Sequence, residues 1–462
     1  MTPDLIVVSD LHLGGGRDAT TGRFHHLEAF FHDEDLEEFC GWLVDEAATH
    51  GRGVRLILNG DTFDLLRVEP ERGAPADAVV AVRAILAGHP GVVRGWAHLL
   101  AAGHEVIVLP GNHDLELQDD AVQAEVRAAL AAALAARGVD VGALARLRFE
   151  PWFHHEPGRI WIEHGSQYDP EGAFRFLLRG RCGSADADRD LPLGNFFQRH
   201  LYNAFGRIAF VVPSSEANFA YLRWLALHEP RALARVLARH LPFALRLLGR
   251  IAGKARGDAA SLADAHERGL AALAVSSGLG DRLRGIDALK TVGDLRDGAW
   301  RSIRRVARGI VTTVLLGALA LACWSVGQHA IEGLPLGLAP KTVLSLGLGL
   351  AMLLIGGAGA LFFLLRTPAP RKMPLAAAAA KLATITAVPL VAFGHSHEED
   401  VAVLPDAARY FNTGTWITIF LDGNAPRAPV QYTFLHVTGA TAELRYYVPG
   451  PARSRPVVLV DR

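Results

Sequence analysis

The sequence predicts an α/β domain whose chain is interrupted by a long helical insertion that carries a membrane hairpin. Three features lead to this prediction. Short apolar runs alternate with helical stretches up to residue 171, two long charge-free runs follow residue 308, and strand-like runs return after residue 385. Strands that alternate with helices are typical of a sheet whose two faces are both covered.

The first part of the domain, residues 1–171, contains three apolar runs that each lead into a polar loop. These runs are LIVVSD at 5–10, VRLILNGD at 54–61 and EVIVLPGN at 105–112, and all three predict buried strands. Helices are expected at 26–50 and 119–137, the second of which is rich in alanine. The stretches RLRFEPWF and RIWIEHG flank HHEPG, which predicts a β-hairpin that ends at His164.

The charge balance argues against a nucleic-acid-binding protein, and the cysteine content argues against a protein stabilised by disulfides. The 462 residues contain 47 Lys and Arg against 48 Asp and Glu, so the formal net charge is -1. No global field therefore attracts nucleic acid, and no nucleic-acid partner is expected. The three cysteines are far apart and form no CxxC pair, which argues against a disulfide framework and for a reducing compartment.

Residues 172–307 are predicted to form a basic helical insertion, followed at 308–366 by a two-helix transmembrane hairpin. Residues 309–331 and 342–365 contain no Asp, Glu, Lys or Arg, and each run exceeds the roughly 20 apolar residues that a bilayer crossing requires. The alternative is a buried helical hairpin inside a large soluble domain. Basic residues flank both outer ends of the hairpin, whereas its turn holds only Glu332 and Lys341. The positive-inside rule therefore predicts a membrane protein whose α/β domain faces the cytoplasm.

Residues 385–462 return to strand-like patterns separated by turns. The strand-like runs are AVPLVAFGHSH, ARYFNTGTWITIF, VQYTFLHV and ELRYYV. Because the two ends of a membrane hairpin lie in the same compartment, this last part can complete the domain that residues 1–171 begin.

Five short stretches place carboxylate, imidazole and amide side chains at the ends of the strand-like runs. They are Asp10-Leu11-His12, Gly60-Asp61-Thr62-Phe63-Asp64, Gly111-Asn112-His113-Asp114, His164-Gly165 and Gly394-His395-Ser396-His397. The ends of strands in α/β sheets are where sites collect. Oxygen and imidazole ligands suit Mn²⁺, Fe²⁺ or Zn²⁺, and two such ions about 3.5–4 Å apart can clamp a phosphate and activate a water. The sequence therefore predicts a two-metal phosphoesterase site, with Asp61 as the natural bridging carboxylate.

This ordered set closely resembles the pattern of the calcineurin-like metallophosphoesterases, which reads D-x-H, G-D-x-x-D, G-N-H-D or G-N-H-E, a later histidine and G-H-x-H. The resemblance implies a two-sheet sandwich flanked by helices and two divalent ions, with manganese expected and iron or zinc as alternatives. Mapped by position, it implies three groups of metal ligands: Asp10, His12 and His397 for the first ion, Asn112, His164 and His395 for the second, and Asp61 as the bridge.

The same resemblance implies roles for three further residues. His113 would reach the phosphate and either protonate the leaving oxygen or stabilise charge. Asp64 and Asp114 would lie behind the ligands, orient histidines and raise their basicity. Either aspartate could instead simply cap a turn.

Within the family, SDLHLGGG and NGDTFDL look most like the branch of UDP-diacylglucosamine pyrophosphatases. The chain departs from that branch in the residues SQYDP after Gly165, where an aspartate would directly follow the glycine, and in its long insertion. The expected function is hydrolysis of a phosphoester or pyrophosphate bond in a phosphorylated small molecule or a lipid at the membrane. The alternatives are a tethered hydrolase of soluble nucleotides or phosphoproteins, and a membrane scaffold without catalysis.

Overall fold

The structure is a computed structural model that describes most of the α/β domain and part of the insertion. The described residues are 2–18, 20–68, 77–179, 191–200, 203, 230–231, 234, 238, 258–292, 315, 317–365, 375–417, 420–421, 425–426, 432–449 and 453–457, with the main chain alone at 354–365 and a few other positions. The chain divides into two compact units: Met1–Gly293 with Lys372–Arg462, and Asp294–Arg371.

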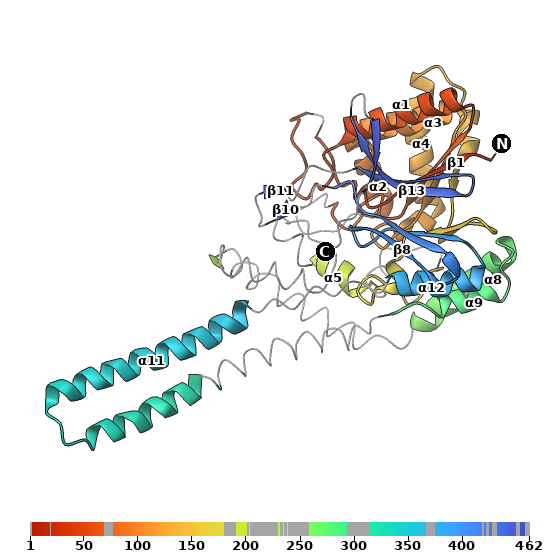
Figure 1. Cartoon of the computed structure of the whole chain (residues 1–462). Coiled ribbons are helices and arrows are strands. Elements are labelled where there is room, and N and C mark those ends of the chain that lie inside the picture. Colours follow the sequence, from red (N-terminus) through yellow and green to blue (C-terminus); the bar gives the residue numbers. More distant parts are fainter. Residues whose placement is uncertain are drawn as a thin grey trace. The chain divides into compact units, whose positions relative to one another are not determined.

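Seven strands form the larger sheet of the first unit, in the order β14-β13-β12-β1-β2-β3-β4 (Figure 1). Their bounds are β1 Asp4–Val8, β2 Val54–Asn59, β3 Glu105–Leu109, β4 Leu147–Phe149, β12 Thr433–Thr438, β13 Thr441–Val448 and β14 Arg453–Pro456. Strands β1 to β4 run parallel, whereas β12 pairs antiparallel with β1, so that Leu5 lies opposite Val437. Strands from both ends of the chain therefore share this sheet.

Five strands form the second sheet, in the order β5-β6-β7-β9-β8. Their bounds are β5 Phe153–Glu156, β6 Ile160–Glu163, β7 Leu390–Phe393, β8 Glu399–Val403 and β9 Arg409–Thr413. The expected hairpin is the antiparallel pair β5 and β6, in which Phe153 lies opposite Glu163. Strands β6, β7 and β9 run parallel. A short ribbon, β10 Phe420–Leu421 with β11 Ala425–Pro426, lies outside both sheets.

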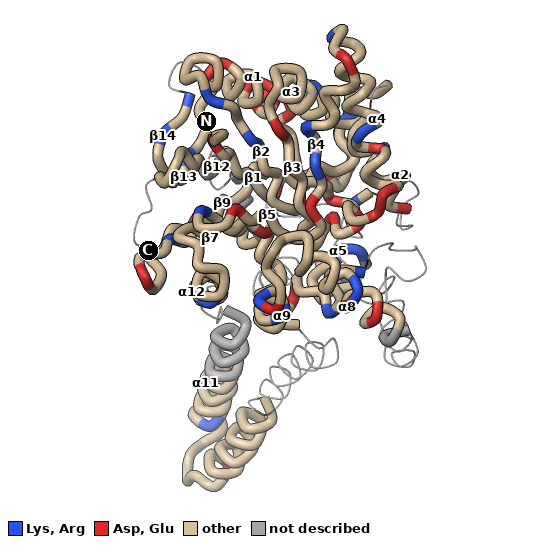
Figure 2. Tube along the Cα trace, turned by 90° about the vertical axis from the view of Figure 1, so that its right-hand side faces the viewer, with Lys and Arg blue, Asp and Glu red and all other residues tan. Residues whose placement is uncertain are grey.

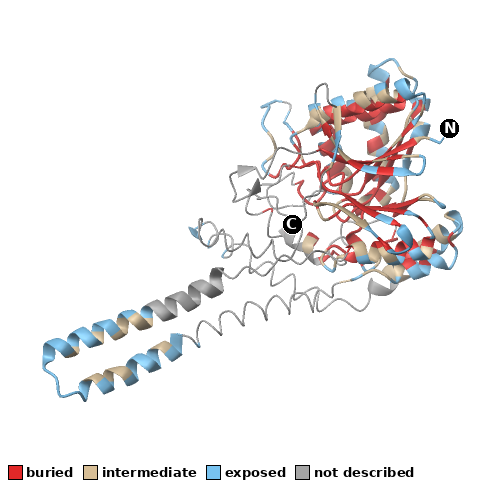
Figure 3. Cartoon of the chain, in the orientation of Figure 1, coloured by how far each residue is buried: buried red, intermediate tan, exposed pale blue. Residues whose placement is uncertain are grey.

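The alternation of side chains along β1 explains how the layers pack. Leu5 and Val7 belong to an apolar cluster that also contains Ile162 and Phe411 of the second sheet. Ile6 and Val8 point to the opposite face and pack with a different cluster, which contains Phe39 of a covering helix. Because neighbouring side chains in a strand face opposite ways, a fully apolar strand such as this one must be covered on both faces. Figure 3 shows the buried residues concentrated in these sheets.

Helices cover the outer face of each sheet. The helices packed on the larger sheet are α1 Asp33–His50, α2 Ala78–Gly88, α3 Pro90–Ala101 and α4 Asp120–Ala136. Those packed on the second sheet are α8 Asp258–Ser276, α9 Arg282–Asp287 and α12 Leu375–Thr386. Short 3-10 turns lie at Leu115–Gln118, Val141–Arg146, Ser166–Tyr168 and Pro405–Ala407. The prediction of an α/β fold with two mixed sheets and flanking helices is confirmed.

The boundaries of several predicted elements need correction. The strands predicted at 5–10, 54–61 and 105–112 end at Val8, Asn59 and Leu109, so their polar ends belong to loops. The helix expected at 26–50 begins only at Asp33. Helices α2 and α3, which follow one another at 78–101, were not anticipated from the sequence.

The predicted hairpin at 308–366 is described in part. The chain is helical at 317–332, and after a short turn α11 covers Leu338–Leu365. Residues 309–314 and 316 of the first predicted span lie outside the described residues. Among the residues that were described, no helix meets the length and apolar character needed to cross a membrane, so the transmembrane prediction is not supported there. Of the helical insertion at 172–307, the structure describes α5 Leu193–His200, α8 and α9, and most of its arginine-rich part at 221–256 lies outside the described residues.

Candidate metal centre

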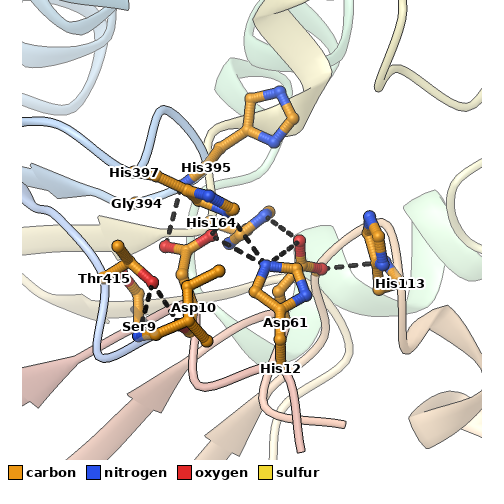
Figure 4. Close-up of polar contacts among 12 residues, drawn as sticks. Ser9, Asp10, His12, Asp61, His113, His164, Gly394, His395, His397 and Thr415 are labelled. Carbon is orange, nitrogen blue, oxygen red and sulfur yellow. Dashed lines mark hydrogen bonds and ion pairs between the residues drawn. The ribbon is translucent and has the colours of Figure 1, made fainter. Parts of the chain in front are cut away.

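The five predicted stretches meet where strands of the two sheets end. Asp10 and His12 follow β1, Asp61 follows β2, and Asn112 follows β3; His164 follows β6, and His395 and His397 follow β7. Main-chain hydrogen bonds join neighbouring loops: Asp10 N donates to Gly60 O at 3.1 Å, and His12 N donates to Asp61 O at 2.9 Å. Figure 4 shows the side chains of Asp10, His12 and Asp61 from one sheet turned toward the histidines of the other.

One group of three side chains brings together Asp10, His12 and His397. The Nε2 atoms of His12 and His397 are 2.9 Å apart, and His397 Nε2 lies 3.2 Å from Asp10 Oδ1. His12 Nδ1 lies 3.3 Å from the buried carboxylate of Asp64. A proton on His12 Nδ1 suits that contact and leaves the lone pair of Nε2 directed at His397. Such a geometry is able to hold a cation.

A second group consists of Asp61, His164 and His395, which could also hold a metal ion. Asp61 Oδ2 lies 3.2 Å from His164 Nε2 and 3.7 Å from His12 Nε2. The carboxylate of Asp61 thus touches a member of each group, which is the position that a bridging ligand needs. His164 Nδ1 lies 3.0 Å from Asn59 O, so a proton on Nδ1 leaves Nε2 free to act as a ligand.

Unsatisfied buried atoms test whether these residues fit metal ions. Asp10 Oδ1, Asn112 Oδ1 and His164 Nε2 are buried and form no hydrogen bond of good geometry within the described part of the chain. A buried polar atom without a partner costs about 1–3 kcal/mol. Other buried atoms of the described chain also lack a hydrogen bond, but these three belong to predicted ligands. Each offers a lone pair of the kind that divalent cations accept, His164 once Nε2 has lost its proton. The residues therefore fit the predicted metal ions.

Backbone strain also concentrates at the predicted ligands. Asp10, His12, Asp61, His395 and His397 all have positive φ, between 48° and 68°. Non-glycine residues rarely adopt this region, and each such residue costs of order 1 kcal/mol or more. Strain of this kind persists where the surrounding structure enforces it. Here the strained residues direct side chains from successive loops toward one point.

Two glycines permit the close approach of the ligand loops. A Cβ atom on Gly111 would lie 2.1 Å from Asp61 Oδ1, and one on Gly394 would lie 2.5 Å from Asp10 Oδ2. Both loops run so close to a ligand carboxylate that no side chain fits between them. The glycines in the G-N-H-D and G-H-x-H stretches are therefore required by the packing of the site.

The buried acids and histidines of the centre shift one another's pKa values. Burial alone would raise the pKa of Asp10, but the neighbouring His164 and His397 outweigh it and lower that pKa. Burial lowers the pKa of His12 to about 4, so its imidazole is neutral at pH 7. Burial opposes a proton on His164 too, yet Asp61 and Asp10 raise the pKa of this histidine to about 10. A metal ion that binds Nε2 would therefore have to displace a proton from it.

Asp64 links the first ligand group to His113. Its Oδ1 lies 2.9 Å from His113 Nδ1, and its Oδ2 lies 3.3 Å from His12 Nδ1 and 2.9 Å from Arg67 Nε. The carboxylate is fully buried, and although burial acts to raise its pKa, Arg67 and His113 lower it strongly. Asp64 therefore contacts and orients two histidines at once.

Asp114 has a different role from the one that the resemblance implies. Its carboxylate accepts hydrogen bonds from four main-chain groups: Gly111 N at 2.6 Å, Thr62 N at 2.8 Å, Phe63 N at 3.0 Å and Asp61 N at 3.2 Å. It orients no histidine in the described structure; instead it ties the loop after β2 to the loop after β3. The expectation that it orients a histidine is therefore corrected, and its bond from Gly111 N three residues earlier fits the alternative that it caps a turn.

Two residues of the site were missed at the level of sequence. Asp169 Oδ2 lies 2.9 Å from His395 Nε2, and the side chain of Asn195 hydrogen-bonds to Asn112. Asp169 belongs to the SQYDP stretch that departs from the pyrophosphatase branch, and Asn195 lies on α5 in the insertion. No motif marks either residue, because each meets its partner only through the folding of the chain.

The chain matches no family model, and a search of curated proteins finds no relative. Its function is therefore inferred from the geometry and chemistry of the site.

Proposed function

We propose that this protein is a metal-dependent phosphoesterase of the calcineurin-like kind, which hydrolyses a phosphoester or pyrophosphate bond with two divalent ions. The observation that carries the proposal is the convergence of two His and Asp groups on Asp61, which touches His12 of one group and His164 of the other. The unsatisfied buried atoms of Asp10, Asn112 and His164 support it. A site for a single structural ion needs only one of the two groups.

The proposed ligands divide between the two groups and the bridge. Asp10, His12 and His397 would hold the first ion, and Asn112, His164 and His395 the second, with Asp61 shared. Ligands of mixed nitrogen and oxygen type suit manganese, and iron and zinc are accepted by the same donors. When bound, two such ions polarise a phosphoryl oxygen and lower the pKa of a coordinated water.

The chain's own residues supply orientation and a proton donor. Asp64 holds the Nδ1 side of both His12 and His113, so each ring directs its Nε2 edge away from Asp64. Main-chain N of His113 donates to Asp61 Oδ1 at 2.8 Å, which fixes the start of the His113 side chain beside the bridging carboxylate. His113 is thus placed to give a proton to the leaving oxygen of a substrate bound at the centre.

Chelation of the purified full-length protein tests this function. We expect turnover of bis-p-nitrophenyl phosphate that EDTA abolishes and Mn²⁺, Fe²⁺ or Zn²⁺ restores. A diphosphate lipid in detergent-free vesicles and a soluble nucleotide diphosphate, assayed side by side, separate a lipid-directed enzyme from a tethered hydrolase of soluble substrates. Absence of turnover with all three metals on every substrate contradicts the proposal and favours the non-catalytic scaffold.

We further propose that the hairpin attaches the protein to a membrane, with the catalytic domain in the cytoplasm. Figure 2 shows the described part of the hairpin almost entirely in the colour of uncharged residues. In the sequence, Glu332 and Lys341 are the charged residues of this described part. Apolar side chains from both helices are more than half exposed, among them Leu321, Val326, Leu346, Leu350 and Leu353. The helices contact one another through Ser345 Oγ and Gln328 Oε1 at 2.8 Å. Burying this much apolar surface in lipid is favourable, and flanking basic residues favour the cytoplasmic side.

Replacement of Leu346 and Leu350 by glutamate tests the membrane attachment. We expect the native protein to float with anionic vesicles and to resist alkaline carbonate, and the L346E/L350E variant to be released, because an acidic residue at a helix centre costs about 2.5–3.5 kcal/mol to insert. The matched control is V80E/V141E, which changes two exposed valines of the catalytic domain and should leave flotation unchanged. Flotation of L346E/L350E equal to that of the native protein argues against insertion of the hairpin.

A further inference from the structure

Among the side chains proposed to hold the second ion, Asn112 is the one whose orientation is not set by its own chemistry. Asn112 ends in an amide that can present either an oxygen, which binds cations, or an NH₂ group, which does not. Asn112 follows Gly111, which packs against Asp61, and precedes His113, whose main-chain N donates to Asp61 Oδ1. Its loop is therefore held at the bridging carboxylate, but the direction of the amide must be decided by another contact.

Two hydrogen bonds to Asn195 set the direction of the Asn112 amide. Its Nδ2 donates to the main-chain oxygen of Asn112 at 2.5 Å, and its Oδ1 accepts from Asn112 Nδ2 at 2.9 Å. A main-chain carbonyl can only accept, so Asn195 must turn its NH₂ group toward it and its oxygen toward the Asn112 side chain. Asn112 must then donate with Nδ2. Asn112 Oδ1 is left as a buried atom without a hydrogen bond, ready to act as a ligand.

Helix α5 holds Asn195 against the catalytic domain. Asn195 is 1% exposed, and Gly194 N donates to Glu171 O at 2.9 Å. Just beyond the helix, Asn203 Nδ2 donates to Leu66 O at 2.7 Å, while its Oδ1 accepts from Gln198 Nε2 at 2.9 Å. The position of Asn195 therefore depends on the docking of the insertion's first helix.

The same segment orients a second ligand of the same group. Asp169 Oδ2 lies 2.9 Å from His395 Nε2, which leaves Nδ1 as the ligating nitrogen of that ring. Asp169 and Asn195 both follow β6, on the way into the insertion. In the first ligand group, by contrast, His12 is oriented by Asp64, which belongs to the loop after β2. The segment from Asp169 to α5 therefore contacts proposed ligands of the second ion, Asn112 and His395, and not His12 of the first.

We propose that Asn195 and Asp169 are positioning residues through which the turn after β6 and the insertion's first helix complete the second metal site. This inference rests on the proposed function. The first ion would bind whether or not α5 is docked, whereas full affinity for the second ion would require α5 in place. Any partner or substrate that moves the insertion would then control the number of bound ions, and with it the activity.

Metal stoichiometry of full-length variants tests the proposal. Native protein, N195A and D169A are each loaded with Mn²⁺, passed over a chelating resin and assayed for manganese per chain. We expect two ions in the native protein and about one in each variant, with affinity for the second ion reduced about 10–100-fold, the range found when groups behind metal ligands are removed. The controls are Q123A and D140A, which remove hydrogen bonds to Leu117 O and from Gly142 N that involve no proposed ligand and no part of α5, and both should keep two ions.

The outcomes separate the inference from the function on which it rests. Two ions bound at native affinity in both variants overturn the positioning role and leave the two-metal enzyme standing. No bound ion in the native protein overturns both. Retention of the first ion serves as the check on folding, because an unfolded variant would lose both ions. Loss of both ions from N195A and D169A, with melting temperatures unchanged, would also overturn the proposal.

Discussion

Replacing Asp61 by alanine is expected to remove both metal ions together with the activity. The Asp61 carboxylate contacts His12 of the first ligand group and His164 of the second, so neither proposed site keeps its full ligand set without it. Burial acts to lower the pKa of His164, but Asp61 together with Asp10 raises it to about 10. The loss of metal ions that contribute several kcal/mol to transition-state stabilisation corresponds to a fall in kcat/KM of about 10³-fold or more.

Manganese content per chain and kcat/KM of D61A, measured on the same preparation, check this expectation. The control is D119A, which removes a carboxylate that caps the start of α4 through Ala121 N and should retain both ions and native kinetics. One firmly bound ion in D61A would show that the carboxylate serves a single site, and its assignment as the bridging ligand would then fail.

Replacing His113 by alanine is expected to slow the reaction by about 10²–10⁴-fold while both ions remain bound. His113 contacts Asp64 through Nδ1 and Asp61 through its main-chain N, but it belongs to neither proposed ligand set. If it donates a proton to the leaving oxygen, the loss should be large for a poor alkoxide leaving group. The loss should be small for p-nitrophenolate, which leaves without protonation.

A comparison of alkyl and p-nitrophenyl phosphodiesters in H113A, with manganese content measured in parallel, checks this role. H436Q serves as the control, because His436 is partly exposed and pairs with Asp4 at the far end of β1. Equal losses with both leaving groups would refute the proton-donor role, and metal lost to the same extent as in D61A would instead make His113 a ligand.

Local patterns in the sequence predicted much of the fold and most of the side chains that meet at the candidate metal centre. The apolar runs before Asp10, Asp61 and Asn112 are strands, because a buried parallel strand needs apolar side chains on both faces. The polar residues that follow each run lie in loops at the strand ends, where the parallel arrangement brings them together. Strand order, by contrast, depends on pairing between distant segments, so the position of β12 beside β1 was not read from either segment alone.

Contacts between distant segments account for the features of the site that the sequence did not predict. Asp114 was expected to orient a histidine, yet its carboxylate accepts four main-chain hydrogen bonds from two loops. The residue type alone does not predict which donors will surround a buried carboxylate. Asn195 and Asp169 reach ligands that are 83 and 226 positions away in the chain. Residue types and their local spacing thus identify which side chains can bind metal, because that chemistry is a property of each side chain. The direction of the Asn112 amide and the nitrogen that His395 offers depend on folding, because each is set by a hydrogen bond to a segment that no local pattern connects with it.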